Sequence, residues 1–395
     1  MTPTAAGTIL TLNTGSSSLK AGLFQLGPTF TPLLSARLDR IGLSRSQFRV
    51  ADPSGSPLLD RSVQLDDHDS AIRELLEWLR GQSTLSAVRC VGHRVVHGGR
   101  RFARPMLVTE DLLAELERLS PIVPDHLPHS INAIRSATAA LPAAAQVACF
   151  DTGFFSGMPG VARTYGLPRE LAEQGVVRYG FHGLSCEYIM HELRRIHGAR
   201  GRVVIAHLGN GASVSAVRDE QPIDTSMGFT PTGGLVMGTR CGDLDPGVML
   251  YLSEARGLGP RDLNELFNHR SGLIGVSQTS SDMRQLLLIE KSNARAAEAI
   301  ELFCYTARKF IGALTAAMGG VEALVFTGGI GENAAVIRRR ICEQLGHLGI
   351  SLDAQANDSH APFISARGSP TTVRVIKADE ELMIARHAHG IHSGL

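Results

Sequence analysis

A short apolar run that breaks at a turn of small residues occurs three times in this chain. The turns are at residues 13–18, 209–213 and 327–333. Each follows a run that predicts a β-strand, at 8–12, 202–208 and 322–326, and the first two resume at once as strands, at 19–26 and 214–217. Turns rich in Gly, Ser and Asn let backbone N–H groups curl around a phosphate. Three of them in one α/β chain favour nucleotide phosphate binding over plain tight turns.

The first two turns also indicate an internal duplication. Setting Gly15 on Gly211 sets Ser17 on Ser213, an offset of 196 in a chain of 395 residues. Two similar strand–turn–strand openings half a chain apart predict two related domains. A chance likeness between two glycine turns is the alternative.

Composition narrows the class of protein. Hydrophobic residues make up 43% and charged residues 19%, as in soluble globular proteins of two or three domains. A net charge of +1 provides no field that would attract nucleic acid, and no apolar stretch is long enough to span a membrane. The six cysteines are scattered and form no CxxC pair, which fits a reducing cytoplasm.

Several familiar motifs are absent. There is no GxxxxGK[ST] loop, and the run at 328–331 is not GxGxxG, so neither a P-loop nor a dinucleotide-binding motif is indicated. His191 and His197 are six residues apart and do not make HExxH, so a surface helix is the better interpretation of that stretch.

Longer motifs resemble one family from end to end. Residues 13–20, 92–99, 179–183, 206–213, 224–231, 238–243 and 329–333 are similar to the acetate kinase family, which includes propionate and butyrate kinases. The resemblance implies an α/β fold of two duplicated ribonuclease-H-like (actin-like ATPase) domains with an interdomain cleft. It implies a first domain at 1–151, completed by a C-terminal helix at 380–395, and a second domain at 152–379 that binds nucleotide and forms a homodimer.

The resemblance also implies a reaction. ATP and a short carboxylate would give ADP and an acyl phosphate by direct in-line transfer, with Mg²⁺ or Mn²⁺ as the metal. The direction of the reaction in the cell stays open. The expected partners are a nucleotide and a small carboxylate, with no nucleic acid and no membrane.

Cations should dominate catalysis, because an anionic carboxylate must meet an anionic phosphoryl group. The resemblance places Arg94 at the carboxylate and the transferring phosphoryl group, and Arg240 at the transition-state oxygens and the carboxylate. His182 and Asn210 can donate hydrogen bonds to the same oxygens, and His126 matches another active-site histidine of the family. Asp151 would orient Arg94 or a metal-bound water, because a carboxylate nucleophile is already ionised and needs no base.

The same resemblance implies three groups of ligand-binding residues. The nucleotide would contact Ser16, Ser18, Lys20, His207, Leu208, Gly209, Asn210, Gly211, Gly329, Ile330, Gly331, Glu332 and Asn333. The acid would lie among Arg94, Val96, Asp125, Phe181 and Pro231. The metal would lie near Asn13 and Glu380.

Asp125 departs from the family pattern, which usually has Leu before the active-site histidine. The following residues through His129 also depart from the usual Asn-Pro-Pro. A carboxylate against a substrate methyl group is costly unless it is hydrogen-bonded or turned away. Either Asp125 points to solvent and the enzyme is an ordinary acetate kinase, or it makes the pocket polar and a hydroxy acid such as glycolate is accepted.

Other classes of protein would share the three glycine-rich turns. A phosphohydrolase would use Asp151 as a true base on water. A chaperone-type ATPase or an actin-like filament protein would lack the two arginines, and a nucleotide-binding module would show no acid-dependent turnover. Trapping the acyl phosphate with hydroxylamine separates the kinase from all of these.

Overall fold

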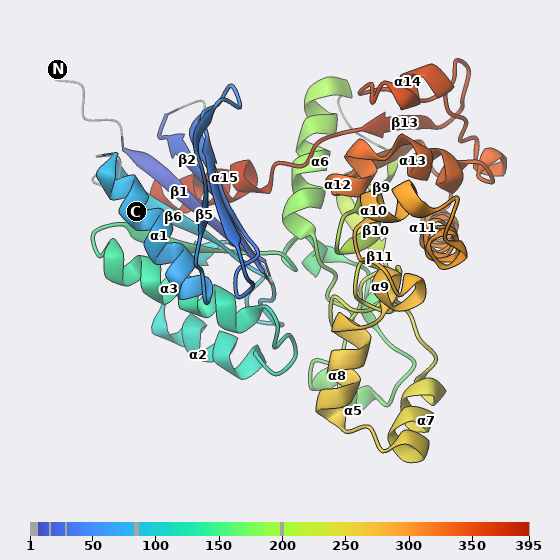
Figure 1. Cartoon of the computed structure of the whole chain (residues 1–395), viewed down its shortest axis with the longest axis horizontal. Coiled ribbons are helices and arrows are strands. Elements are labelled where there is room, and N and C mark those ends of the chain that lie inside the picture. The colour runs from blue at the N-terminus through green and yellow to red at the C-terminus, as the bar shows by residue number, and fades with distance from the viewer. Residues whose placement is uncertain (1–6, 16, 28–29, 83–86, 198–200, 395) are drawn as a thin grey trace. The chain divides into compact units, whose positions relative to one another are not determined.

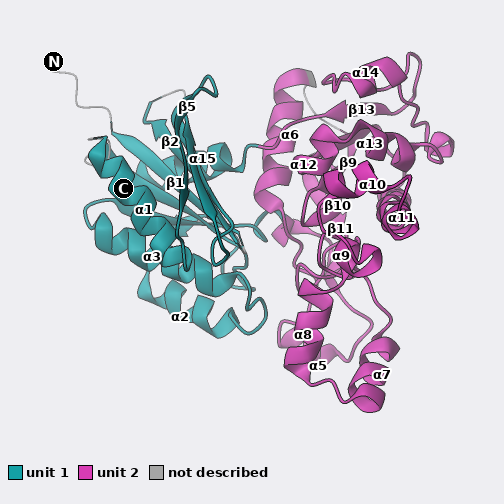
Figure 2. Cartoon of the chain, viewed as in Figure 1, with its two compact units in different colours: residues 1–154, 379–395 teal, residues 155–378 magenta. Residues whose placement is uncertain are grey.

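The computed structural model describes residues 7–15, 17–27, 30–82, 87–197 and 201–394. Contacts divide the chain into two compact units (Figures 1 and 2). Unit 1 comprises residues 1–154 and 379–395, and unit 2 comprises residues 155–378. Each unit contains its own β-sheet.

Unit 1 is built on a sheet with the strand order β5-β4-β3-β2-β1-β6-β8-β7. β1 is antiparallel to β2 and parallel to β6, which is parallel to β8. Its elements are β1 Thr8–Thr14, β2 Ser18–Gln25, β3 Thr31–Asp39, β4 Ser46–Ala51, β5 Pro57–Val63, β6 Val88–Val95, β7 Met106–Leu107, β8 Ala145–Phe150, α1 His68–Gly81, α2 Glu110–Leu119, α3 Leu127–Ala140 and α15 Glu380–His392.

Helices cover both faces of the central strands of unit 1. Val91 on β6 belongs to the apolar core beneath α1 and α3. The next residue, Gly92, faces α15, because a methyl group placed on it would lie 2.6 Å from Cγ2 of Ile384. Successive side chains of a strand point to opposite faces, so α15 packs on the face away from α1 and α3. The absence of a side chain at Gly92 is what lets α15 approach β6.

Unit 2 contains a sheet with the strand order β11-β10-β9-β12-β13. Its strands are β9 Arg202–Leu208, β10 Ala212–Arg218, β11 Gln221–Thr225, β12 Ala323–Thr327 and β13 Thr372–Val375. Its helices are α4 Gly160–Arg163, α5 Arg169–Glu173, α6 Gly183–His197, α7 Pro246–Arg256, α8 Pro260–His269, α9 Gly272–Ser277, α10 Met283–Ile289, α11 Ala294–Met318, α12 Gly328–Asn333, α13 Ala335–Cys342 and α14 Ala354–Asp358.

The two sheets repeat one topology. The order β3-β2-β1-β6-β8 of unit 1 matches β11-β10-β9-β12-β13 of unit 2, with antiparallel and parallel pairs in the same places. The predicted α/β duplication is therefore confirmed. The offset needs correction: β1 begins at Thr8 and β9 at Arg202, so the strands repeat after 194 residues, and Gly15 is level with Gly209 rather than Gly211.

Two further features differ from or extend the sequence analysis. The third predicted turn is already helical, since α12 begins at Gly328, whose φ is +76°. The strands β3, β4 and β5, which extend the sheet of unit 1 beyond β2, were not predicted. Within the described ranges, no helix combines the length and the apolar character needed to cross a bilayer.

We predict that Gly92→Ala lowers the free energy of unfolding by about 1–3 kcal/mol, because the new methyl group would push α15 off β6. Gly81→Ala is the matched control, since a methyl group at this end of α1 meets nothing within 4 Å. Urea unfolding of both variants measures the difference. Equal stability would mean that α15 shifts without loss of packing.

Candidate active site

Four predicted site residues of unit 1 lie together at the carboxyl ends of its parallel strands. Asn13 lies near the end of β1, Arg94 near the end of β6, and Asp151 directly after β8. Glu380 begins α15. Parallel strands end at the same edge of a sheet, which is where open α/β sheets bind their ligands.

Arg94 is the centre of this group. Its Nη2 donates to Oδ2 of Asp151 at 2.8 Å, and its Nη1 makes longer contacts of 3.4 Å with Oδ1 of Asn13 and the carbonyl of Thr14. The guanidinium is 13% exposed and Asp151 is 0% exposed. Burial alone would lower the pKa of Arg94, but the charges of Asp151 and Glu380 outweigh it and raise the pKa, so the charge is permanent. The expected pairing of Asp151 with Arg94 is present.

One donor of Arg94 has no partner among the described residues. Its Nε is buried without a hydrogen bond, and Oε2 of Glu380 is 4.0 Å away from it. A buried N–H without a partner costs free energy unless a ligand or water satisfies it. The ion pair with Asp151 therefore fixes the guanidinium while leaving it able to take a further anion.

A pair of carboxylates lies beside Asn13. Its Nδ2 donates to Oε2 of Glu380 at 2.8 Å and to Oε1 of Glu381 at 3.1 Å. Burial raises the pKa of Glu381, and the charge of Lys20 partly opposes this. Carboxylate oxygens are hard donors of the kind that bind Mg²⁺, which usually has few protein ligands and keeps several water molecules. Within the described residues, no three His, Cys, Asp or Glu side chains are grouped so that they could hold a metal ion.

The first glycine turn is held in part by His68, which the sequence analysis did not identify. The N–H of Gly15 donates to the carbonyl of Ser18 at 2.8 Å, and Nε2 of His68 lies 2.8 Å from the carbonyl of Gly15. The ring of His68 stacks on His129, with 4.0 Å between centroids. No local motif marks His68, which is the first residue of α1. Ser18 begins β2, Lys20 is exposed on β2 opposite Asn13, and Ser16 lies outside the described residues.

The predicted acid-pocket residues of unit 1 fall into two places. Val96 follows β6 and is 2% exposed. Asp125 and His126 are half-buried in the turn before α3, with His126 at its N-cap. Burial lowers the pKa of His129, and the charge of Asp125 acts against that shift. Asp125 thus acts electrostatically on His129, in the same group that supports the first turn.

In unit 2, Arg240 and His182 meet at the second glycine turn. A methyl group placed on Gly211 would lie 3.4 Å from both Nη1 of Arg240 and Nε2 of His182. Nη1 of Arg240 donates to the carbonyl of Pro231 at 3.1 Å. Two predicted catalytic side chains therefore lie against one backbone turn, close enough that a methyl group on Gly211 would be in van der Waals contact with both.

His182 is oriented by its surroundings. Its φ of 60° lies in the left-handed region, its Nδ1 lies 2.9 Å from Oγ of Ser213, and its ring stacks on His207 at 4.2 Å. Nδ1 of His207 in turn lies 2.9 Å from Oγ of Ser185. With Nδ1 engaged by Ser213, the side of the ring that carries Nε2 is directed at the turn. Phe181 beside it is 1% exposed.

The second and third turns of unit 2 adjoin each other. Leu208 is fully buried, and a methyl group on Gly328 would lie 2.7 Å from its carbonyl oxygen. The turn at 209–211 also touches Gly238, whose added methyl group would lie 2.0 Å from Oδ1 of Asn210. The same added methyl group would lie 3.3 Å from the carbonyl oxygen of Ser281. Residues near 281 therefore adjoin this site, although no motif predicted them.

Polar side chains of α12 bond within the turn. The Oε1 atom of Glu332 accepts from the N–H groups of Gly328 and Ala378 at 3.0 and 3.1 Å, and Nδ2 of Asn333 donates to the carbonyl of Gly329 at 2.9 Å. Gly329 is exposed and Ile330 half-buried. The side chain of Glu332 is thus committed to holding the turn.

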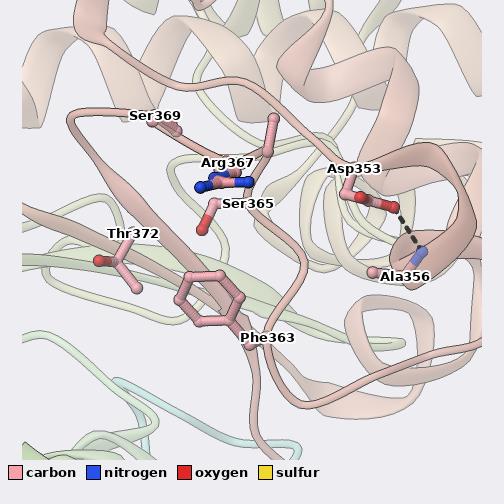
Figure 3. Close-up of a pocket in the computed structure, with 9 residues that line it drawn as sticks. Asp353, Ala356, Phe363, Ser365, Arg367, Ser369 and Thr372 are labelled. Atoms are coloured by element: carbon pink, nitrogen blue, oxygen red, sulfur yellow. Dashed lines mark hydrogen bonds between the residues drawn. The ribbon is translucent and has the colours of Figure 1, made fainter.

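A hollow of about 490 Å³ lies elsewhere in unit 2 (Figure 3). Its lining includes Asp353, Phe363, Ser365, Arg367 and Thr372, and none of its residues is among the predicted site residues. The candidate site is therefore defined by the strand ends and turns rather than by this hollow.

Comparison with known proteins matches this arrangement to one family. The acetokinase family model matches residues 8–386. The chain belongs to the acetokinase family. It is 46% identical to an acetate kinase of Rhodopseudomonas palustris strain TIE-1, over 98% of each chain, and 41% identical to one of Halothermothrix orenii, over 96% of this chain and 98% of the relative.

Solved structures agree. The acetate kinase of Porphyromonas gingivalis has a TM-score of 0.86 at 37% identity, and a propionate kinase of Francisella tularensis has a TM-score of 0.90 at 35% identity. Each comparison covers 98% of this chain and 100% of the other. The predicted family and fold are confirmed, and this acetokinase-family chain is a phosphotransferase with a carboxylate acceptor.

We predict that Asp151→Asn lowers the free energy of unfolding by about 3 kcal/mol, because it leaves a buried guanidinium without its main counter-charge. Asp111→Asn is the matched control: Asp111 pairs with Arg101 at the same 2.8 Å, but both side chains are more than half exposed. That change should cost no more than about 0.5 kcal/mol. Urea unfolding of both variants at pH 7 measures the two values, and equal losses would show that Asn13 and Glu380 suffice to hold Arg94.

Proposed function

We propose that this chain transfers the γ-phosphoryl group of ATP reversibly to acetate, giving ADP and acetyl phosphate by direct in-line attack of the carboxylate. The observation that carries the proposal is Arg94, a buried guanidinium fixed by Asp151 whose Nε donates no hydrogen bond within the described residues. Its fixed charge and open donor suit an anion that must approach another anion.

Arg240 and His182 serve the transferring phosphoryl group. Both lie against Gly211 in a turn that carries backbone N–H groups, and Nε2 of His182 is directed at it. Charge develops on the equatorial oxygens during transfer, and donors held in place before the reaction stabilise it most. Asp151 keeps Arg94 in position and takes no proton, because the attacking carboxylate is already ionised.

Asn13 and Glu380 would hold Mg²⁺, in part through water, with Glu381 beside them. The ion would neutralise charge on the phosphate oxygens. Support comes from the donor chemistry alone: one amide oxygen and two carboxylates at a strand end, too few to enclose the ion. The residues of the three glycine turns, including Lys20, Asn210 and Gly331, are assigned to the nucleotide.

Acetate is favoured over a hydroxy acid because the residues assigned to the methyl group are apolar. The charge of Asp125 acts on His129 of α3, whose ring stacks on His68. Val96, Phe181 and Pro231, each buried, are the apolar groups assigned to the methyl group. Propionate is the second candidate, supported by the fold shared with the Francisella propionate kinase.

We also propose that the enzyme is a cytoplasmic homodimer that associates through α7. Val248, Met249, Leu250 and Tyr251 are 39–56% exposed, and no residue of this helix is buried. Consecutive exposed apolar residues are typical of an interaction surface. We assign a second copy of the chain to this surface because the family resemblance implies a homodimer formed through the second domain, to which α7 belongs. Scattered cysteines support a reducing compartment.

An acid panel tests the activity. With ATP, Mg²⁺ and hydroxylamine, acetate should give acyl hydroxamate with a kcat/KM at least about tenfold above that of glycolate, since an apolar wall gains little from a hydroxyl group. Propionate should fall between them. Preference for glycolate would place Asp125 in the acid pocket, and ADP release without hydroxamate would indicate a phosphohydrolase.

Light scattering during size-exclusion chromatography tests the dimer. Leu250→Glu should convert the dimer to monomer at micromolar concentration, because it places a charge in a buried apolar interface. Leu288→Glu is the matched control, since Leu288 is 86% exposed on α10 away from that run. A wild-type monomer, or a dimer that survives Leu250→Glu, would reject α7 as the interface.

A further inference from the structure

Arg338 on α13 is the largest fully buried side chain of the described residues, with 0% exposure. It is satisfied without a carboxylate. Its Nε donates to Oδ1 of Asn357 at 2.8 Å and its Nη2 to the carbonyl of Asn357 at 2.7 Å. Its Nη1 donates to the carbonyls of Gly331 and Glu332 at 2.9 and 3.0 Å.

A buried cation that has no carboxylate among its hydrogen-bond partners is costly and calls for an explanation. Burial lowers the pKa of Arg338, and Cys342 and Asp358 only partly oppose this. An apolar side chain of similar volume would avoid the cost of burying charge. An apolar side chain could not, however, donate hydrogen bonds to several carbonyl oxygens at once, as the planar guanidinium does.

The carbonyls at Gly331 and Glu332 belong to the end of α12. This helix has six residues, too few to be stable alone, and its last carbonyl groups have no partner within the helix. Arg338 supplies the missing donors. Nδ1 of His360, 3.1 Å from the carbonyl of Glu332 and 3.3 Å from Nη2 of Arg338, lies in the same network.

The other side of this network is α14. Asn357 is 1% exposed and its Nδ2 donates to the carbonyl of Ala335, so it links α14 to the start of α13. Asp353 and Ala356, earlier on the same segment, line the hollow of Figure 3. Arg338 thus joins α12 to a second element that is itself anchored.

The position of α12 matters for the turn beside it. Its first residue, Gly328, packs on the backbone of Leu208, and the N–H of Gly329 lies 4.0 Å from where a methyl group on Gly209 would be. A shift of α12 would therefore disturb residues 329–333 and the turn at 209–211 together. Displacements of about 1 Å at a site can cost about 10²-fold in rate.

We propose that Arg338 is a positioning residue of the nucleotide site, which fixes α12 through the carbonyls of Gly331 and Glu332. The proposal rests on the nucleotide role assigned above to residues 329–333. It predicts that loss of the guanidinium weakens nucleotide binding while leaving acid binding, assigned around Arg94, unchanged.

The test compares Arg338→Met, Arg338→Lys and Arg339→Gln in the full chain. Arg339 is the neighbouring arginine on α13 and pairs with Asp358, but its side chain is 45% exposed. ADP binding is measured by calorimetry, and the KM values for ATP and acetate are measured by hydroxamate formation. Arg338→Met should raise the Kd for ADP and the KM for ATP about tenfold or more, with the KM for acetate within about twofold of wild type. Arg338→Lys should lie between, because an ammonium reaches fewer of the carbonyls at once, and Arg339→Gln should match wild type.

Wild-type ADP binding by folded Arg338→Met would overturn the proposal, as would equal rises in both KM values. If Arg338→Met does not fold, Arg338→Lys decides: unchanged ADP binding overturns the proposal and selective weakening supports it. Calorimetry separates this inference from the proposed function, because it needs no acid. A wild-type chain that binds ADP but forms no hydroxamate would reject the activity alone, and one that binds no ADP would reject both.

Discussion

The ion pair between Arg94 and Asp151 is the interaction on which the unit 1 site depends. It joins the ends of two parallel strands, β6 and β8, at 2.8 Å with Asp151 fully buried. The start of α15 adds Glu380 to the same place, and this is possible because Gly92 lets the helix pack on β6. Residues that are hundreds of positions apart in sequence therefore create one fixed positive charge beside two carboxylates. Chemistry between anions needs such a charge held before the substrate arrives.

The two buried arginines show how environment decides what a guanidinium does. Acidic neighbours raise the pKa of Arg94, and one of its donors stays open. Burial lowers the pKa of Arg338, and all three of its nitrogens bond to protein acceptors. A guanidinium with acidic neighbours and an open donor can bind a ligand, whereas one whose nitrogens are all bonded to protein acceptors can only hold the backbone. The sequence alone does not distinguish these two roles, because both residues are arginine.

Local patterns predicted the framework well for a physical reason. Strand, turn and strand are encoded within about fifteen residues, so β1, β9 and β12 and their turns could be read from apolar runs and small residues. The catalytic candidates came from the family resemblance, which carries residue positions but not contacts. The supports were missed because they act across the sequence: His68 reaches Gly15 from α1, and Arg338 needs Asn357 from another helix. The strands β3 to β5 were missed because they carry no turn motif of that kind.

The motif at 329–333 shows that a family resemblance does not reveal which groups a side chain contacts. A polar residue in a nucleotide-binding motif is easily taken for a ligand contact, yet the Oε1 atom of Glu332 accepts from the N–H groups of Gly328 and Ala378. Asn333 similarly donates back to Gly329. These side chains hold the curve of the turn, so the proposed phosphate contacts here would come from backbone N–H groups near Gly329, which is exposed. Backbone donors make no demand on side-chain identity beyond small size, which explains why glycine recurs in all three turns.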